Sequence, residues 1–257
     1  GLLSVFLVVS LLSAEPVQLQ QTDKGWQLLR GNQDYHVKGA GGDTQLDLLV
    51  QCGGNSMRTW GIGEKTGKVL DEAHSKGLTV CLGIWLGQVQ QGMNYDDFDT
   101  TQEQLGLVRE AVEKYKDHPA LLCWGIGNEM EIGAGNEYAS AALWEHVDHA
   151  ARIVKELDPN HPTMTVIAEI GGRKVEAIHA LCPNIDIVGI NAYGGAPSLP
   201  KRYRELGGTK PIMLTEFGPL GFWEMKPNHF GVVPEFTSTA KARFYRSAYE
   251  AMSDPIC

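Results

Sequence analysis

The chain has 257 residues and a net charge of −9; 43% of its residues are hydrophobic and 21% are charged. Such a composition is typical of a globular protein, and the length is about that of a single (β/α)8 barrel. The acidic balance argues against nucleic acid as a partner, because nucleic-acid-binding domains present a basic surface.

The first residues form an apolar run from Leu2 to Leu12, interrupted by Ser4 and Ser10. The run is too short to span a bilayer comfortably, so we expect no stable membrane insertion. It resembles the hydrophobic region of a secretory signal, with a cleavage point at Ser13-Ala14. We therefore expect residues 1–14 to be a partial signal peptide and the protein to be secreted or periplasmic. The alternative is a membrane-proximal anchor.

Metal and cofactor sites are not indicated. The chain has five cysteines, and none has the C-x-x-C spacing of a zinc site. Cys81 and Cys123 fall inside predicted strands, so we expect buried thiols there. The acidic cluster Asp96, Asp97 and Asp99 lacks the spacing and glycine of a calcium loop, and a solvated loop is the better interpretation. No cofactor is predicted.

Residues 15–34 are expected to form a short N-terminal β-hairpin. Val17 to Gln20 alternates apolar and polar residues, as a strand does. The dipeptides Lys24-Gly25 and Gly31-Asn32 indicate turns on either side of a second apolar stretch. The hairpin would lead into the main domain, residues 35–257, and cap its lower end.

Alternating strands and helices follow along the chain, which predicts an α/β protein with a parallel sheet. A helix after Thr100 or Thr101 has a capping-box pattern, and further helices are expected near 64–75, over 143–157 and over 238–252. We expect a (β/α)8 TIM barrel, truncated before strand eight because only seven strands are found. The expected strands span 35–39, 56–60, 78–85, 121–128, 164–168, 185–191 and 211–215.

Two glutamates occupy matching positions in this pattern. The apolar run that begins at Leu121 stops at Glu129, and the run that begins at Pro211 stops at Glu216. The carboxyl ends of barrel strands carry the active sites of these folds. Two carboxyl groups that face one crevice, about 5–5.5 Å apart, are what a retaining glycosidase needs, since one protonates the leaving oxygen while the other attacks the sugar.

Five stretches, as an ordered set, resemble the motifs of clan A of the retaining glycoside hydrolases. The resemblance covers roughly residues 35 to 250 and is closest to the catalytic barrel of family 2, with family 5 next. The stretches are Tyr35–Gly39, Gly54–Trp60, Trp124–Glu129, Asp186–Tyr193 and Pro211–Gly218.

The resemblance implies a role for each matching residue. Glu129 would be the acid/base and Glu216 the nucleophile. Asn128 would bind the 2-hydroxyl group of the sugar, a contact that strengthens in the transition state. Tyr193 and Arg58 would hold the nucleophile ionised and aimed, by a hydrogen bond and by charge.

The chain also departs from these families. Family 2 enzymes carry β-sandwich domains before the barrel, whereas only a hairpin precedes it here. Family 5 usually has histidine where Asn191 stands, so this expected substrate-binding residue places the barrel nearer to family 2. The aromatic residue that usually lines the sugar site from strand eight would lie beyond the last residue.

Aromatic residues in the expected loops suit a carbohydrate substrate, because an aromatic face packs on the apolar face of a pyranose. Trp85 ends the third strand, and Trp223 follows the nucleophile. Both are predicted to bind substrate. Trp60 and Trp124 lie within strands, and we expect them to be structural.

Two further acids compete for a functional role. Glu131 lies two residues after Glu129, where a solvated loop acid is expected. Glu169 ends the fifth strand and could line the cleft.

We therefore predict a glycoside hydrolase that cleaves a β-O-glycosidic bond of an oligo- or polysaccharide with retention. Three alternatives stay open. A transglycosidase such as a glucanosyltransferase would use the same intermediate, and a non-catalytic carbohydrate-binding barrel would not need both acids. A metal-dependent barrel hydrolase would need histidine and aspartate at the strand ends.

Overall fold

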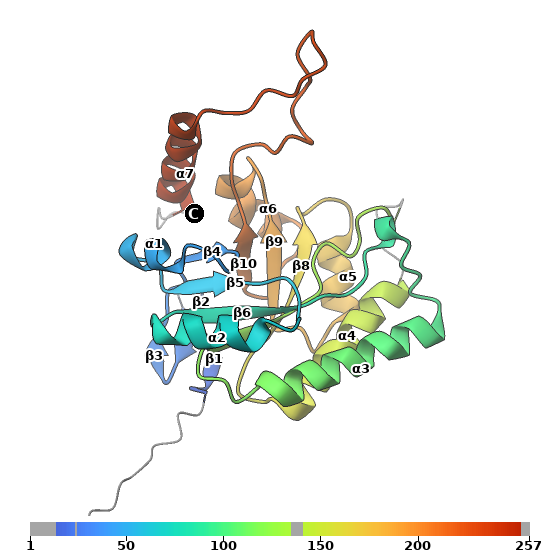
Figure 1. Cartoon of the computed structure of the whole chain (residues 1–257). Helices are drawn as coiled ribbons and strands as arrows, with labels where there is room; N and C mark the ends of the chain where they lie inside the picture. Colours follow the sequence, from blue (N-terminus) through green and yellow to red (C-terminus); the bar gives the residue numbers. More distant parts are fainter. Residues whose placement is uncertain (1–13, 24, 135–140, 253–257) are drawn as a thin grey trace, which may run out of the picture.

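The computed structural model describes residues 14–23, 25–134 and 141–252. Most of the predicted signal peptide, as well as Lys24 of the first predicted turn, lies outside these residues. Seven parallel strands curl into a barrel wall with helices on its outside, below which lies a small antiparallel sheet (Figure 1). The predicted α/β barrel with a short N-terminal β unit is confirmed.

The barrel strands are neighbours in chain order, as repeated βα units require. The two edge strands, β4 and β10, are not paired with each other in the described part of the chain. The strands are β4 Gly39–Gly41, β5 Ser56–Arg58, β6 Thr79–Ile84, β7 Leu121–Ile126, β8 Thr163–Ala168, β9 Ile187–Asn191 and β10 Ile212–Glu216. The helices are α1 Leu46–Gln51, α2 Thr66–Ser75, α3 Phe98–Tyr115, α4 Ala141–Leu157, α5 Lys174–Leu181, α6 Leu199–Glu205 and α7 Ser238–Met252, with 3₁₀ turns η1 Val89–Gln91 and η2 Ala196–Ser198.

Some predicted boundaries were wrong. The first barrel strand begins at Gly39 rather than at Tyr35, because the preceding residues are held by the side chain of Asn55, which accepts from the Lys38 amide at 2.8 Å. Helix α3 begins at Phe98, before the predicted caps, because Asp97 accepts a hydrogen bond from the Asp99 amide. The short helices α1, α5 and α6 were not predicted.

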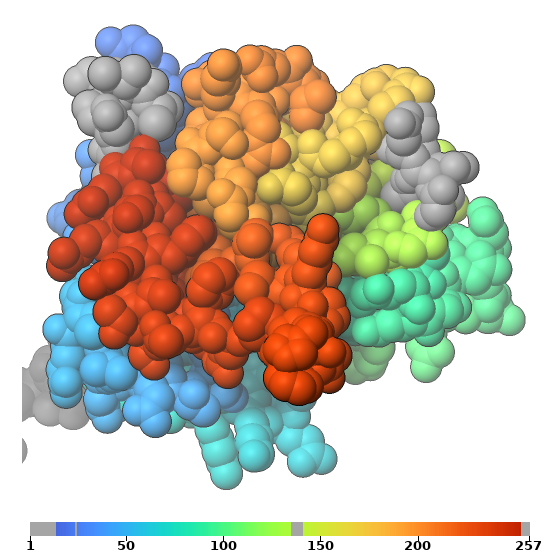
Figure 2. All heavy atoms as spheres, turned by 90° about the horizontal axis from the view of Figure 1, so that it is seen from above, coloured from blue at the N-terminus to red at the C-terminus, as the bar shows by residue number. Residues whose placement is uncertain are grey.

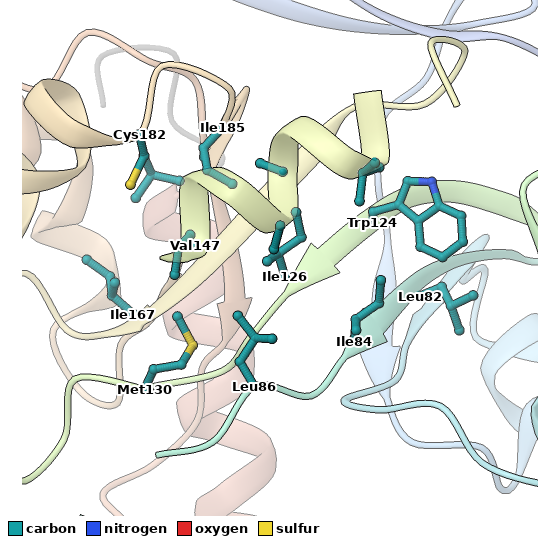
Figure 3. Close-up of a cluster of buried hydrophobic side chains, with 14 of the residues drawn as sticks. Leu82, Ile84, Leu86, Trp124, Ile126, Met130, Val147, Ile167, Cys182 and Ile185 are labelled. Carbon is teal, nitrogen blue, oxygen red and sulfur yellow. The ribbon is translucent and has the colours of Figure 1, made fainter. Parts of the chain in front are cut away.

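The barrel wall separates two apolar layers, because successive side chains of a strand point to opposite faces. The outer layer packs strands against helices: Figure 3 shows Leu82 of β6, and Trp124 and Ile126 of β7, with Val147 of α4. The inner layer is smaller and contains both predicted buried thiols, which are confirmed as buried. Its members are Cys81, Cys123, Met164, Val166 and Ile187.

The lower end of the barrel is covered by a three-stranded sheet, one strand more than the predicted hairpin. Its strands are β1 Val17–Thr22, β2 Gly25–Arg30 and β3 Gln33–Asp34. Leu19 packs against the inner apolar layer, and the Val17 amide donates to the Asn160 carbonyl at 2.8 Å. This sheet therefore closes the barrel at the end opposite to the strand tips.

The upper end of the barrel carries the longest stretch without regular structure, residues 217–237, followed by α7. In the view from above, the orange and red atoms of this stretch and of α7 border the blue atoms of the first βα unit (Figure 2). Phe217 contacts Tyr245 of α7 through their rings, with centroids 5.6 Å apart. Helix α7 thus lies beside the strand tips, on the side of β10 and β4.

Candidate active site

Glu216 reaches the barrel mouth because of a break in strand register. β10 pairs with β9 in parallel, and the register shifts between Leu214 and Glu216. The shift lets both Thr215 and Glu216 face the interior, where Thr215 donates to the Asn191 side-chain carbonyl at 2.7 Å. In regular pairing, these consecutive residues would point to opposite faces.

Three hydrogen-bond donors surround the Glu216 carboxylate. Arg58 and the Trp60 indole each donate to Oε1 at 2.9 Å, and the Tyr193 hydroxyl donates to Oε2 at 2.7 Å. Arg58 is nearly buried, with 7% of its surface exposed, so its charge acts in a poorly solvated environment. This arrangement orients the carboxylate and suits its anionic form.

Glu129 follows β7 in a constrained turn. Gly127 has φ 70° and Glu129 has φ 53°, the left-handed region that is uncommon for residues other than glycine. A side chain at Gly127 would overlap Met130, whose sulfur lies 2.0 Å from an ideal Cβ position. The backbone turns sharply here, and the Asn191 amide group donates to Glu129 Oε1 at 2.7 Å.

A chain of hydrogen bonds joins the two acids. The side-chain oxygen of Asn128 accepts from Arg58 at 2.7 Å and from Asn191 at 3.3 Å. Arg58 also holds Glu216, and Asn191 also holds Glu129. The ends of four strands, β5, β7, β9 and β10, therefore contribute side chains to one network, and Arg58 also donates to the Thr215 carbonyl at 3.4 Å.

The turn that carries Glu129 is also held by the neighbouring loop after β6. The Gln88 side chain donates to the Asn128 carbonyl at 3.0 Å. Two backbone bonds continue this contact, from Val89 to the Met130 carbonyl at 3.0 Å and from Gln90 to the Ile132 carbonyl at 2.9 Å. These bonds hold the strained turn in place.

The environments of the two acids differ. Burial raises the pKa of Glu129; the nearby carboxylates of Glu216 and Glu131 add to the rise, and the hydrogen bond from Asn191 opposes it. Burial and the bond to Glu216 also raise the pKa of Tyr193, which keeps its hydroxyl protonated as a donor. Glu129 is thus suited to carry a proton, and Glu216 to accept three hydrogen bonds.

The competing acids are held in other contacts. Glu131 is buried, and its Oε1 accepts from the Ala168 amide at 2.8 Å and from Lys174 at 3.0 Å, so the expected solvated loop acid was wrong. The backbone of Glu169 has φ 46°. Its carboxylate accepts hydrogen bonds from both terminal nitrogens of Arg202, at 2.9 and 3.3 Å. The Arg202 contact occupies the Glu169 carboxylate.

The two tryptophans that were predicted to bind substrate lie at different distances from the acids: Trp223 contacts the site, and Trp85 does not. Trp223 is 59% exposed and its ring meets that of Tyr193 edge to face, with centroids 5.3 Å apart. Trp85 is 42% exposed at the tip of β6, and no ring contact or hydrogen bond links it to the two acids in the described part of the chain.

The sequence reasoning missed Trp60. We expected it to be structural, but its indole nitrogen donates directly to Glu216. Its position two residues after Arg58, at the tip of a strand, was a usable signal. Trp124 is structural as predicted, because it is buried and donates to Asp158 at 2.8 Å.

Among the described residues, no group of three or more metal-binding side chains is placed to hold an ion. Asp97, from the acidic cluster, serves as a helix cap. In the same residues, no helix is both long and apolar enough to cross a membrane.

The fold is an α/β barrel in which one hydrogen-bond network joins two glutamates at the carboxyl ends of the strands. The sequence matches the family model described as "Glycosyl hydrolases family 2, TIM barrel domain" over residues 55–247. The chain therefore belongs to this family, as the motifs indicated. No curated protein matches the sequence.

Several solved structures share the fold. A β-D-glucuronidase of Dictyoglomus thermophilum has a TM-score of 0.68 at 18% identity, over 93% of this chain and 44% of that one. A β-galacturonidase of Eisenbergiella tayi, bound to galacturonate, has a TM-score of 0.68 at 17% identity, over 92% and 44%. A β-glucuronidase of Bacteroides uniformis has a TM-score of 0.69 at 16% identity, over 93% and 31%. The chain thus spans less than half the length of these proteins.

Proposed function

We propose that the protein is a retaining β-glycosidase that acts by double displacement, with Glu216 as the nucleophile and Glu129 as the acid/base. The observation that carries this proposal is the contrast between the two acids. Glu216 receives three donors and is oriented as an anion, while burial and nearby negative charge favour the protonated form of Glu129.

In the first step, a Glu216 oxygen attacks the anomeric carbon, and the bond from that carbon to the leaving oxygen breaks. The proton of Glu129 passes to the leaving oxygen. Arg58 and Tyr193 release part of their interaction with Glu216 as its charge is consumed in the new ester bond.

In the second step, Glu129 takes a proton from water while the water oxygen attacks the anomeric carbon. The ester bond to Glu216 breaks and the sugar leaves with its original configuration. Asn128, whose side-chain oxygen accepts from Arg58 and Asn191, would bind the 2-hydroxyl group of the sugar through its amide nitrogen.

The β configuration of the substrate is supported by the solved structures that share the fold, because those compared are two β-glucuronidases and a β-galacturonidase. Trp223 at the rim would pack on a sugar on the leaving-group side, next to Tyr193.

We further propose that the protein is exported, because the apolar run at residues 2–12 resembles the hydrophobic region of a secretory signal. Cell fractionation tests this proposal.

Two variants of the full-length protein test the roles. Glu216→Ala should abolish turnover on every substrate, because no covalent intermediate can form. Glu129→Ala should lose about 10²–10⁴-fold on substrates with poor leaving groups, yet still release activated aryl groups that need no proton. Azide should restore Glu129→Ala and give a β-glycosyl azide.

The assignment is reversed if azide instead restores Glu216→Ala with formation of a β product. If neither the wild-type protein nor any variant releases an aryl group, the barrel is a binding protein. Glu224→Ala, an acid from the stretch after β10 that lies outside the network, serves as the matched control.

A further inference from the structure

The ladder between β6 and β7 ends just before the acid/base, and a side chain continues it. The last paired residues are Ile84 and Ile126, after which the Gly127 amide donates to the Ile84 carbonyl at 2.8 Å. The next bond between the two segments runs from the side chain of Gln88 to the carbonyl of Asn128, at 3.0 Å. A side-chain amide thus takes the place of a backbone N–H where the chain begins its turn.

Backbone bonds continue this contact in alternating order. The Val89 amide donates to the Met130 carbonyl at 3.0 Å, and the Gln90 amide donates to the Ile132 carbonyl at 2.9 Å. Every second carbonyl of the turn therefore accepts from the loop after β6. The bond from Gln88 is the first of this row, and it is made by a side chain. A substitution at this residue can remove the bond without changing the backbone.

The side chain of Gln88 is itself held in place. Only 5% of the residue's surface is exposed. Its side-chain oxygen accepts from the Gln90 side chain at 2.9 Å, which directs its amide nitrogen to the Asn128 carbonyl. Leu86 and Met130, from the two joined segments, are fully buried in the outer apolar layer (Figure 3). A side chain that is already ordered in this way holds its partner firmly, because little freedom is left for it to lose.

Both polar atoms of the peptide between Asn128 and Glu129 are held, and they are held from opposite sides. Its carbonyl accepts from Gln88, which follows β6, and its amide donates to the Val166 carbonyl of β8 at 2.9 Å. β6 and β8 are the two neighbours of β7 in the sheet. A peptide is planar, so two bonds at its opposite edges fix the orientation of the whole plane.

The orientation of this plane decides where Glu129 points. Rotation of the plane changes φ of Glu129, which is 53°, and so redirects its side chain. A left-handed φ is unfavourable for residues other than glycine and persists only where the surrounding structure imposes it. The position of a reacting group matters, since a misplacement of about 1 Å can slow a reaction about 100-fold.

We propose that Gln88 is a positioning residue for the acid/base: it holds the peptide before Glu129 in its plane and thereby aims the Glu129 carboxyl group at the leaving oxygen. The inference rests on the proposed function and adds a residue to it. Gln88 acts through Glu129 and not through Glu216, whose three donors come from β5, from the loop after it and from the residues after β9. Its loss should therefore weaken proton transfer and spare the attack on the sugar.

The test uses the full-length protein and two leaving groups on the same sugar. The probes are 2,4-dinitrophenyl and phenyl β-glycosides of glucose, mannose, galactose and glucuronic acid, and the sugar that is accepted serves for all variants. Dinitrophenolate leaves without a proton, whereas phenol leaves much faster when an acid protonates it. The value of kcat/KM reports the steps up to this departure.

Gln88→Met removes the bond to the Asn128 carbonyl and keeps a side chain of similar length. We expect kcat/KM for the phenyl glycoside to fall about 10–100-fold, because a misplaced acid transfers its proton poorly. For the dinitrophenyl glycoside, kcat/KM should stay within about threefold of the wild type. On that substrate kcat and KM should fall together, because the second step needs Glu129 as a base and the covalent intermediate accumulates.

Three further variants complete the comparison. Gln88→Asn keeps the amide group but is shorter by one methylene group, so it tests the same bond without a change of polarity and should show the same selective loss. Gln91→Met is the matched control, because it makes the same change at an exposed residue of the same loop, and both substrates should react as with the wild type. Glu129→Ala gives the largest selective loss and sets the scale.

The proposal is overturned if the Gln88 variants lower kcat/KM for both substrates by the same factor, as a purely structural residue would, or if they change neither value. It is also overturned if neither Gln88 variant folds while Gln91→Met does, because the residue then serves the fold. If Glu129→Ala itself shows no selective loss, or the wild type hydrolyses none of the probes, the proposed function fails and this inference falls with it.

Discussion

The two ends of the barrel use their polar side chains differently. At the lower end, side chains bind backbone atoms: the Tyr35 hydroxyl donates to the Asn55 carbonyl at 2.8 Å, and Arg30 donates to the Pro119 carbonyl at 3.0 Å. At the upper end, the side chains that hold the two acids bind them directly, as Arg58 binds Glu216 and Asn191 binds Glu129, although Gln88 also binds the Asn128 carbonyl. The lower end thus holds the chain in shape, while the upper end holds charges in position.

Stability and activity should therefore respond to different ends of the barrel. The lower contacts hold backbone segments, so their loss should weaken the fold. The upper contacts hold reacting groups over a framework that the strands already fix, so their loss should weaken catalysis. A matched pair of tyrosines allows a direct comparison, because each donates one hydroxyl hydrogen bond.

The largest effect is expected at the upper end. Tyr193→Phe removes one of the three donors to Glu216 and leaves the ring in contact with Trp223. We expect kcat/KM to fall about 10²–10³-fold, the range seen when one preorganised donor is lost. The midpoint of thermal unfolding should stay close to that of the wild type. A variant that loses stability in proportion to activity would contradict the division between the ends.

At the lower end, Tyr35→Phe should have the reverse effect. It removes the bond to the Asn55 carbonyl and a 3.0 Å contact with the Thr79 hydroxyl. We expect the free energy of unfolding to fall by about 0.5–1.5 kcal/mol, because the Asn55 carbonyl loses one donor but keeps the Thr79 amide at 2.9 Å. Denaturant titration gives this value, and kcat/KM should stay within about twofold of the wild type. A large loss of activity in the folded variant would show that the ends are coupled.

A smaller effect is expected from the negative charge of Glu131, which acts on the acid/base Glu129. The Glu131 carboxylate raises the pKa of Glu129, so Glu131→Gln should lower that pKa. Glu129 must be protonated to donate to the leaving oxygen, and its raised pKa extends activity to higher pH. The alkaline limb of the kcat/KM profile should therefore move to lower pH in Glu131→Gln. In Glu176→Gln, an exposed control, it should not move; a shift to higher pH in Glu131→Gln would refute this electrostatic account.

Much of this structure could be predicted from the order of apolar runs along the chain. Leu121 to Ile126 and Ile212 to Leu214 are buried or half-buried strands that stop near carboxylates, and a parallel barrel gathers such ends at one face. This pattern depends only on residues that are close together in the chain, so it can be recognised in a single sequence. The seven strands and the pair of acids followed from it.

Other features depend on contacts between distant segments, which a local pattern does not contain. Trp60 meets Glu216 only because the loop after β5 and the tip of β10, far apart in the sequence, approach each other at the barrel mouth. The register shift in β10 leaves no mark on the apolar pattern, yet it turns Glu216 inward. Helix α1 is only six residues long and has no side-chain cap at Gln45, so no signal marked its start.

The central claim is that Glu216 forms a covalent bond with the sugar. The most direct measurement is mass spectrometry of peptides after the full-length protein is inactivated by 2-deoxy-2-fluoro-β-glycosyl fluorides, which slow the second step more than the first. We predict a single added sugar on the peptide that contains Glu216. A sugar on the peptide that contains Glu129, or an active enzyme whose product has inverted configuration and which carries no label, would contradict the account.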